Sequence, residues 1–134
     1  MKLEPPSLLI TDDDRDFRET LRGVFEQRGY RTHLAADGEE ALDVLSRERI
    51  HLALLDMHMP RLTGLETIRR IRQLPFDVVL PCILISAALD AAIEEEARRQ
   101  RAFSILSKPV RLRDITGAVQ RALSETYNWQ PDFS

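Results

Sequence analysis

Four places in the chain carry acidic, hydroxyl or basic side chains directly after a short apolar run. Asp12, Asp13 and Asp14 follow the first run, and Asp56 closes a second one. Ser86 ends a third apolar run, and Lys108 follows a fourth. If these runs are neighbouring parallel strands, their carboxyl ends meet at one edge of a sheet, where ligands of open α/β proteins bind. The spacing therefore predicts one site built from four separate segments.

The acidic residues of this predicted site suit a hard metal ion. Carboxylates of Asp12, Asp13 and Asp56 brought together would repel one another and raise one another's pKa values. A divalent cation removes that conflict, and Mg²⁺ prefers oxygen-only sites, with Mn²⁺ as the alternative ion. His33 and His51 lie elsewhere in the sequence and the single cysteine, Cys82, lies inside a predicted strand, which disfavours a zinc or copper site.

The remaining groups suit a phosphoryl ligand. A lysine ammonium, a serine hydroxyl and a divalent cation are the groups that stabilise the oxygens of a transferring phosphoryl group. Asp56, placed beside them on a central strand, could act as the nucleophile that accepts this group. Lys108 and Ser86 would then stabilise the charge on the oxygens.

Each residue also has an ordinary structural interpretation. The acidic triplet could cap the helix that follows, Asp56 could lie in a loop, Ser86 could cap, and Lys108-Pro109 could form a turn. These explanations are independent of one another. They would have to place all four groups at the same sheet edge by chance, so their joint arrangement favours a site.

The elements that would position these groups alternate along the chain. Apolar runs predict five strands, and the central ones are apolar on nearly every residue, as in strands buried on both faces of a parallel sheet. Stretches with helical spacing lie between and after them, which gives an α/β fold with helices on both faces of a doubly wound sheet. The predicted strands are Ser7–Thr11, Arg31–Leu34, Leu52–Leu55, Pro81–Ser86 and Ala102–Leu106.

Length and charge limit the alternatives. The 134 residues suit one domain, and the net charge of -3 disfavours a basic nucleic-acid surface. One cysteine cannot form an internal disulfide, no apolar stretch is long enough to span a membrane, and the N-terminus does not resemble a secretory signal. We therefore expect a cytoplasmic protein that contacts neither membrane nor nucleic acid directly. The run Glu94-Glu95-Glu96 followed by Arg98-Arg99 is expected to form ion pairs on a solvated helix face.

The ordered motifs resemble a response-regulator receiver domain of bacterial two-component signalling, similar to the chemotaxis regulator. They are Leu8–Asp14, Leu54–Pro60 with Gly64, Ile83–Ala87 and Ser107-Lys108-Pro109. The similarity covers about residues 7 to 124. It implies a flavodoxin-like five-stranded parallel sheet in the order 2-1-3-4-5 with five helices.

The resemblance also implies roles for individual residues. Asp56 would take a phosphoryl group from a histidine kinase or phosphotransfer protein, and Lys108 and Ser86 would contact that group. Asp13, Asp56 and the backbone carbonyl of His58 would coordinate Mg²⁺ directly, and Asp12 would hold a metal-bound water. The surface of the fourth helix, fifth strand and fifth helix would then change, controlling a partner or output domain. A phosphorylation-linked homodimer is a further expectation.

Two positions depart from the family pattern. Ile105 stands where many relatives have an aromatic residue that moves on activation, and Arg101 stands where glycine is common. Ile105 is the one feature that favours an alternative, a receiver-like binding module that works without phosphorylation. An aspartyl phosphatase is a third hypothesis, but His58 stands where such enzymes carry a second acid. We therefore expect a signalling domain rather than an enzyme.

The expected organisation has three parts. Residues 1–6 form an N-terminal extension, residues 7–124 the receiver domain, and residues 125–134 a tail that either packs on the domain or begins a linker. The sequence identifies neither the cognate kinase nor the output.

Overall fold

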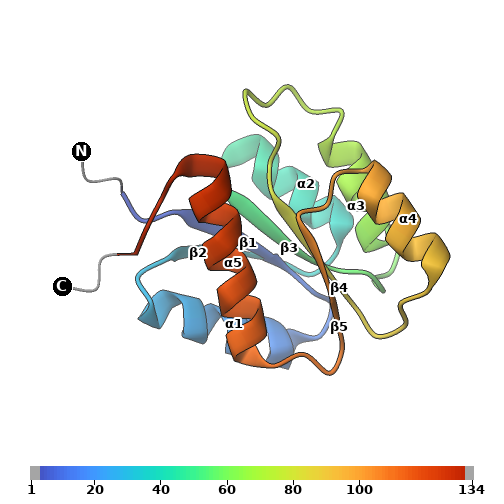
Figure 1. Cartoon of the computed structure of the whole chain (residues 1–134), viewed down its shortest axis with the longest axis horizontal. Helices are drawn as coiled ribbons and strands as arrows, with labels where there is room; N and C mark the ends of the chain where they lie inside the picture. The colour runs from blue at the N-terminus through green and yellow to red at the C-terminus, as the bar shows by residue number, and fades with distance from the viewer. Residues whose placement is uncertain (1–3, 132–134) are drawn as a thin grey trace.

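Five parallel strands alternate with five helices along the chain (Figure 1). The computed structural model describes residues 4–131; residues 1–3 of the expected extension and 132–134 of the expected tail lie outside the described residues. The elements are β1 (Ser7–Thr11), α1 (Arg15–Gln27), β2 (Arg31–Ala35), α2 (Gly38–Arg47), β3 (Leu52–Asp56), α3 (Gly64–Ile71), β4 (Cys82–Ser86), α4 (Ala91–Arg99), β5 (Ser104–Ser107) and α5 (Leu112–Tyr127).

The strand order is β2-β1-β3-β4-β5, which confirms the expected doubly wound sheet. The chain moves outward from β1 to β2, returns to β3 beside β1, and then continues to β4 and β5. The strand order therefore reverses between β1 and β3, and this switch point is where open α/β sheets bind their ligands. The predicted strand bounds agree with the structure to within one residue, except that β5 begins two residues later than predicted, at Ser104.

Both faces of the sheet are covered by helices, as Figure 1 shows. Because successive residues of a strand point to opposite faces, Leu9 and Leu55 pack with α2, α3 and α4, while Leu8 and Leu54 pack with α1 and α5. Every residue of β1, β3 and β4 is buried. This two-sided burial explains why their sequences are continuous apolar runs rather than alternating ones.

Helix α4 is anchored mainly at its C-terminal end. Ala97 is its one fully buried residue. The Arg72 guanidinium, from the end of α3, donates to the carbonyl oxygens of Leu80, Gln100 and Arg101 at 2.7, 2.8 and 3.1 Å. This one side chain ties α3, the start of β4 and the turn after α4 together.

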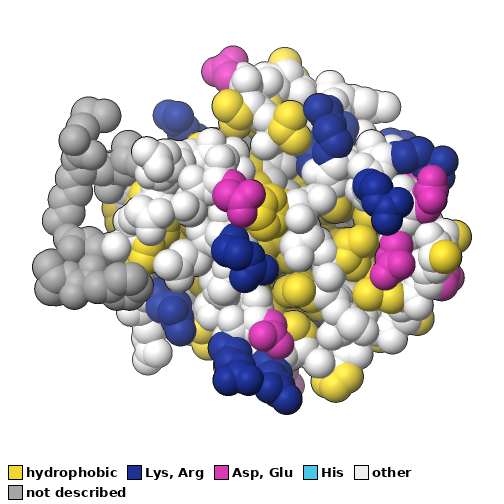
Figure 2. Space-filling view, viewed as in Figure 1, with side chains coloured by type: hydrophobic (Ala, Val, Ile, Leu, Met, Phe, Trp, Pro, Cys, Tyr) yellow, Lys and Arg dark blue, Asp and Glu magenta, His cyan; other side chains and the backbone are white. Residues whose placement is uncertain are grey.

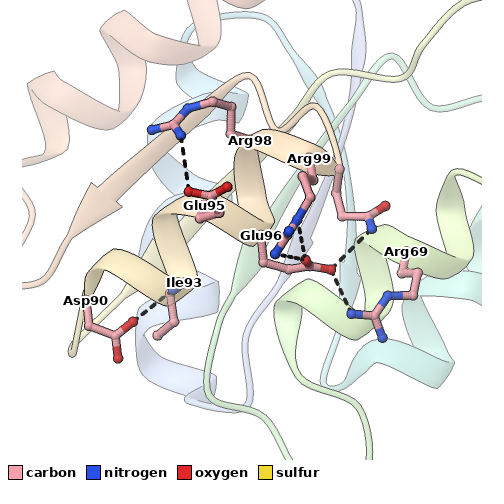
Figure 3. Close-up of polar contacts among 8 residues, drawn as sticks. Arg69, Asp90, Ile93, Glu95, Glu96, Arg98 and Arg99 are labelled. Atoms are coloured by element: carbon pink, nitrogen blue, oxygen red, sulfur yellow. Dashed lines mark hydrogen bonds and ion pairs between the residues drawn. The ribbon is translucent and has the colours of Figure 1, made fainter.

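Ion pairs also hold α4, in part as expected from its charge run. Glu96 bonds Arg99 within the helix at 3.1 Å and reaches Arg69 of α3 at 2.8 Å (Figure 3). Glu95 lies 3.9 Å from Arg98. Figure 2 shows acidic and basic side chains interspersed on one face of the molecule, where most basic side chains lie near acidic ones.

The described part of the tail packs on the domain. Asn128, with φ of 56°, ends α5, and the Trp129 ring lies 5.4 Å from the Tyr30 ring. The Tyr127 hydroxyl donates to the carbonyl oxygen of His51 at 2.8 Å. Helix α5 thus runs to Tyr127 and is fastened at the end of the sheet opposite to the predicted site. Among the helices within residues 4–131, none has the length and apolarity needed to cross a membrane.

Candidate functional site

The predicted site residues meet at the carboxyl edge of the sheet. Asp12 directly follows β1, Asp56 is the last residue of β3, Ser86 is the last residue of β4, and Lys108 directly follows β5. One carboxylate oxygen each from Asp12, Asp13 and Asp56 lies within 4.8 Å of the others. Asp12 and Asp56 are buried, whereas Asp13 is exposed at the mouth of the site.

The members of the acidic triplet have different structural roles. Asp14 is the N-cap of α1, and its carboxylate accepts the N–H groups of Asp16 and Phe17 at 3.0 and 3.2 Å. Asp12 instead accepts the N–H of Asp14 at 2.8 Å, and its own N–H donates to Ala35 at 3.1 Å. The capping interpretation of the triplet is therefore correct for Asp14, and the clustering interpretation is correct for Asp12 and Asp13.

Burial makes the acidic pair electrostatically unfavourable. Burial raises the pKa of Asp12 to about 6, against the lowering effect of its bond from Asp14, and the Asp56 charge raises it further. Burial likewise raises the pKa of Asp56, although the nearby Lys108 opposes this shift. Oδ1 of Asp56 is buried without a hydrogen-bond partner in the described structure. A cation near these oxygens would relieve both effects.

Lys108 supplies one positive charge. Its ammonium lies 3.2 Å from Oδ1 of Asp56, without hydrogen-bond alignment, and 3.7 Å from Oδ2 of Asp12. Partial burial alone would lower the pKa of Lys108, but the two carboxylates together raise it. The ammonium also lies 5.2 Å from the centre of the Phe17 ring, within the range of a cation–π contact. The peptide bond from Lys108 to Pro109 is cis.

Ser86 is fully buried beneath the site. Its hydroxyl oxygen accepts the N–H of Ala88 at 3.2 Å, so it also stabilises the turn after β4. Nε2 of the exposed His58 lies 3.4 Å from the same oxygen. The serine therefore has both a local structural contact and a neighbour from the loop that follows Asp56.

Close packing fixes the backbone after Asp56. A Cβ on Gly64 would lie 2.7 Å from the carbonyl oxygen of Asp56, so only glycine fits at the start of α3. The Gly64 N–H donates to Met57 at 2.9 Å, and a capping box between Thr63 and Glu66 begins the helix. The first turn of α3 is thus held directly against the end of β3.

The residues present fit a magnesium ion. Two buried carboxylates and a third at the mouth form an oxygen-only donor set with excess negative charge, and one of the buried oxygens, Oδ1 of Asp56, accepts no hydrogen bond in the described structure. Lys108 alone cannot neutralise three carboxylates.

Two contacts were not predicted from the sequence. Phe17 is one of the apolar residues of α1 that pack against the core, and nothing in the sequence reveals the ammonium near its ring. The guanidinium of Arg18 donates to the carbonyl oxygen of Asp12 at 2.6 Å and supports the backbone there. Both residues lie one turn into α1, which indicates that this helix also shapes the site.

Comparison with known proteins agrees with this geometry. The family model described as "Response regulator receiver domain" matches residues 8–120. The chain is 39% identical over 123 residues to "Response regulator MprA" of Mycolicibacterium vanbaalenii, covering 91% of this chain and 52% of that protein. The protein of the same name from Mycobacterium avium is 39% identical over 120 residues, with 89% and 51% covered. The chain thus spans about half the length of these curated relatives.

Solved structures share the fold over nearly the whole chain. A CheY-like receiver domain protein from Methanospirillum hungatei matches with a TM-score of 0.85 and 25% identity, covering 90% of this chain and 95% of that one. A receiver protein from Pseudomonas putida matches at 0.84 and 28%, covering 90% and 99%. The receiver domain of a signal transduction histidine kinase from Syntrophus aciditrophicus matches at 0.83 and 26%, covering 96% and 98%. Fold, site geometry and family match agree, and the chain belongs to the response regulator receiver domain family of two-component systems.

Proposed function

We propose that Asp56 is the phosphoacceptor of this receiver domain. The observation that carries the proposal is the pairing of the buried Asp56 carboxylate with the Lys108 ammonium, 3.2 Å away, at the edge where Asp12 and Ser86 also lie. A carboxylate oxygen of Asp56 attacks the phosphorus of a phosphohistidine on a histidine kinase or phosphotransfer protein. The new oxygen–phosphorus bond forms as the phosphorus–nitrogen bond breaks, and the departing imidazole takes a proton and becomes neutral overall.

The chain's own groups stabilise this transfer. Lys108 neutralises charge on a phosphoryl oxygen, and the Ser86 hydroxyl turns from its resting contacts to donate a hydrogen bond to another. Asp13, Asp56 and the backbone carbonyl of His58 would hold Mg²⁺, or Mn²⁺ in its place, and Asp12 would orient a metal-bound water. The ion supplies positive charge beside the developing phosphoryl oxygens.

The output would come from the surface of α4, β5 and α5. Movement of the Ser86 hydroxyl would change its bond with the Ala88 N–H, which lies in the turn that leads to α4. Helix α4 buries few side chains, so a few new charge-assisted bonds at the site would suffice to shift its position. That shift would control a partner or an output domain, and a phosphorylation-linked homodimer is one form it could take.

Mass measurement tests the proposal. The protein is incubated with acetyl phosphate, with and without Mg²⁺, and its intact mass is compared with that of Asp56→Ala. We expect one added phosphoryl group that needs both Mg²⁺ and Asp56. Asp14→Asn is the matched control, since asparagine is an equally good N-cap and Asp14 is outside the proposed machinery. An adduct on Asp56→Ala would refute Asp56 as acceptor.

A short-lived adduct would escape this measurement, so beryllofluoride binding accompanies it. Beryllofluoride mimics a phosphoryl group on a carboxylate without being hydrolysed. If the parent protein neither gains mass nor binds beryllofluoride with Mg²⁺, the phosphoacceptor proposal is refuted. That result would favour the alternative, a phosphorylation-independent binding module.

One observation favours that alternative. Ile105 packs against the core that α2, α3 and α4 cover, and it has no polar tip that could follow Ser86. The complete set of acids with Lys108 favours phosphorylation more strongly. We also propose a signalling rather than an enzymatic role, a cytoplasmic location, and the division into residues 1–6, 7–124 and 125–134.

A further inference from the structure

The loop after Asp56 brings a second side chain to the buried serine. His58 is exposed, yet Nε2 of its ring lies 3.4 Å from Oγ of Ser86, a residue with no exposed surface. His58 lies in the loop that follows β3, and Ser86 ends β4, the parallel neighbour that pairs with β3 up to Asp56 and Ile85. Their contact therefore bridges the two segments between which a phosphoryl group on Asp56 would lie.

The hydrogen-bonding capacity of Ser86 shows what this contact does. A serine hydroxyl has one proton and two lone pairs. One lone pair accepts the Ala88 N–H at 3.2 Å. Nε2 of His58 is the second partner of the hydroxyl, and in the tautomer protonated on Nδ1 it accepts the Ser86 proton. In this resting arrangement the serine has no proton left for a phosphoryl oxygen.

Resting on the proposed function, we infer that His58 is a positioning residue that holds the Ser86 hydroxyl and competes with the phosphoryl group for it. The phosphorylated site needs the Ser86 proton on a phosphoryl oxygen, so the contact with His58 must break. His58 therefore stabilises the unphosphorylated arrangement relative to the phosphorylated one. It acts through Ser86 and takes no part in bond making.

The length of the contact sets the size of the effect. At 3.4 Å it is longer than a well-formed hydrogen bond, so it is weak and easily displaced by a charged phosphoryl oxygen. Loss of one such bond changes an equilibrium by about two- to tenfold. A stronger contact would keep the Ser86 hydroxyl on His58 even in the phosphorylated protein, whereas this weak one only shifts the equilibrium toward the resting arrangement.

The first test is beryllofluoride affinity in the presence of Mg²⁺. We expect His58→Ala to tighten beryllofluoride binding by about two- to tenfold, because Ser86 then has no bond to His58 to break before it binds the ligand. His58→Gln, whose Oε1 can accept the Ser86 proton and reaches about as far as Nε2 of histidine, should return the affinity toward the parent value. His33→Gln, a histidine on β2 outside the site, is the matched control and should change nothing.

A double-mutant cycle identifies the route of the effect. In a Ser86→Ala background the substitution His58→Ala should leave beryllofluoride affinity unchanged, since the shared hydroxyl is gone. An equal gain in that background would show that His58 acts by another route and would overturn the inference. Weaker binding by His58→Ala alone would also overturn it, because His58 would then be a contact of the phosphoryl group.

The free protein provides a readout independent of loading. Without Mg²⁺ or beryllofluoride, the Ser86 side chain should occupy one χ1 rotamer in the parent and exchange among rotamers in His58→Ala, as measured by NMR couplings. A single unchanged rotamer in the variant would overturn the inference. If the parent does not bind beryllofluoride, the proposed function fails, while this rotamer measurement still decides whether His58 holds Ser86.

Discussion

Removal of the Asp12 charge should stabilise the metal-free protein. The side chain is almost fully buried beside Asp56, and burial raises its pKa from 3.8 to about 6. The folded state therefore binds more protons than the unfolded state between these values, and stability falls as pH rises through them. A shift of about two pH units corresponds to about 3 kcal/mol once the group is ionised.

The substitution Asp12→Asn removes this cost and keeps the oxygen that accepts the Asp14 N–H. The attraction between Asp12 and Lys108 at 3.7 Å, which the substitution also removes, lowers the pKa of Asp12 and is already included in this value. We therefore expect the free energy of unfolding to rise by about 1–3 kcal/mol near neutral pH. The gain should vanish near pH 4, where the carboxyl group is protonated in the folded protein as well.

Urea unfolding of parent and variant in chelator, across this pH range, measures the effect. Asp14→Asn serves as the control, because Asp14 is an exposed cap and should show no such gain. Addition of Mg²⁺ should stabilise the parent more than Asp12→Asn, since an ion that binds only the folded state adds more stability the more tightly it binds. Destabilisation of the variant in chelator near neutral pH would refute the electrostatic reasoning.

Three further predictions concern the packing and the backbone of the fold. Gly64→Ala should destabilise the fold by at least about 2 kcal/mol in urea unfolding, because its Cβ would meet the Asp56 carbonyl oxygen. Gly23→Ala, a control with open space around the new Cβ, should stabilise the fold by about 0.5–1 kcal/mol. Equal effects of the two substitutions would refute the packing argument. Arg101→Gly should stabilise the fold by about 0.5–1 kcal/mol and raise the thermal midpoint, because Arg101 has a φ of 58°, a left-handed conformation that strains any residue with a Cβ. A lower midpoint would show that the contacts of the Arg101 side chain contribute more stability than the backbone strain costs. Burial lowers the pKa of His51, whose Nδ1 accepts the Ser7 N–H at 2.9 Å, so the contribution of His51 to folding stability is present above pH 6.5 and is lost as the pH falls below this value. The difference in unfolding free energy between the parent and His51→Gln should therefore shrink on acidification. A difference that stays constant with pH would refute this assignment.

The sheet and the convergence of the site were predictable because both depend on patterns along the chain. Fully buried parallel strands need continuous apolar runs, which is why β1 was predicted at Ser7–Thr11, the bounds that the structure has. Parallel strands with right-handed crossovers present their carboxyl ends at one edge, so the side chains after each run had to meet. The acids, Ser86 and Lys108 were found from this rule alone.

Contacts between side chains of distant segments were not predictable in the same way. The acidic triplet gave no sign that Asp14 would cap the helix while Asp12 turned inward, since both residues suit both roles. The cation–π contact of Phe17 and the approach of His58 to Ser86 depend on rotamers and loop geometry. The start of β5 was placed two residues early because Ala102 and Phe103 are apolar, yet they belong to the turn that Arg101 begins.

The three carbonyl bonds of Arg72 have a mechanical consequence for α4. They fix the C-terminal end of this helix to α3 and to the start of β4, and Glu96 adds a pair to Arg69 nearby. At the other end, the N-cap bond from Ile93 to Asp90 is local to the helix, and Ala87, Ala88 and the first turn are largely exposed. The first turn of α4 is held to the core mainly by the partly buried Ile93, so any displacement of this helix would be smallest near Gln100 and largest in the first turn.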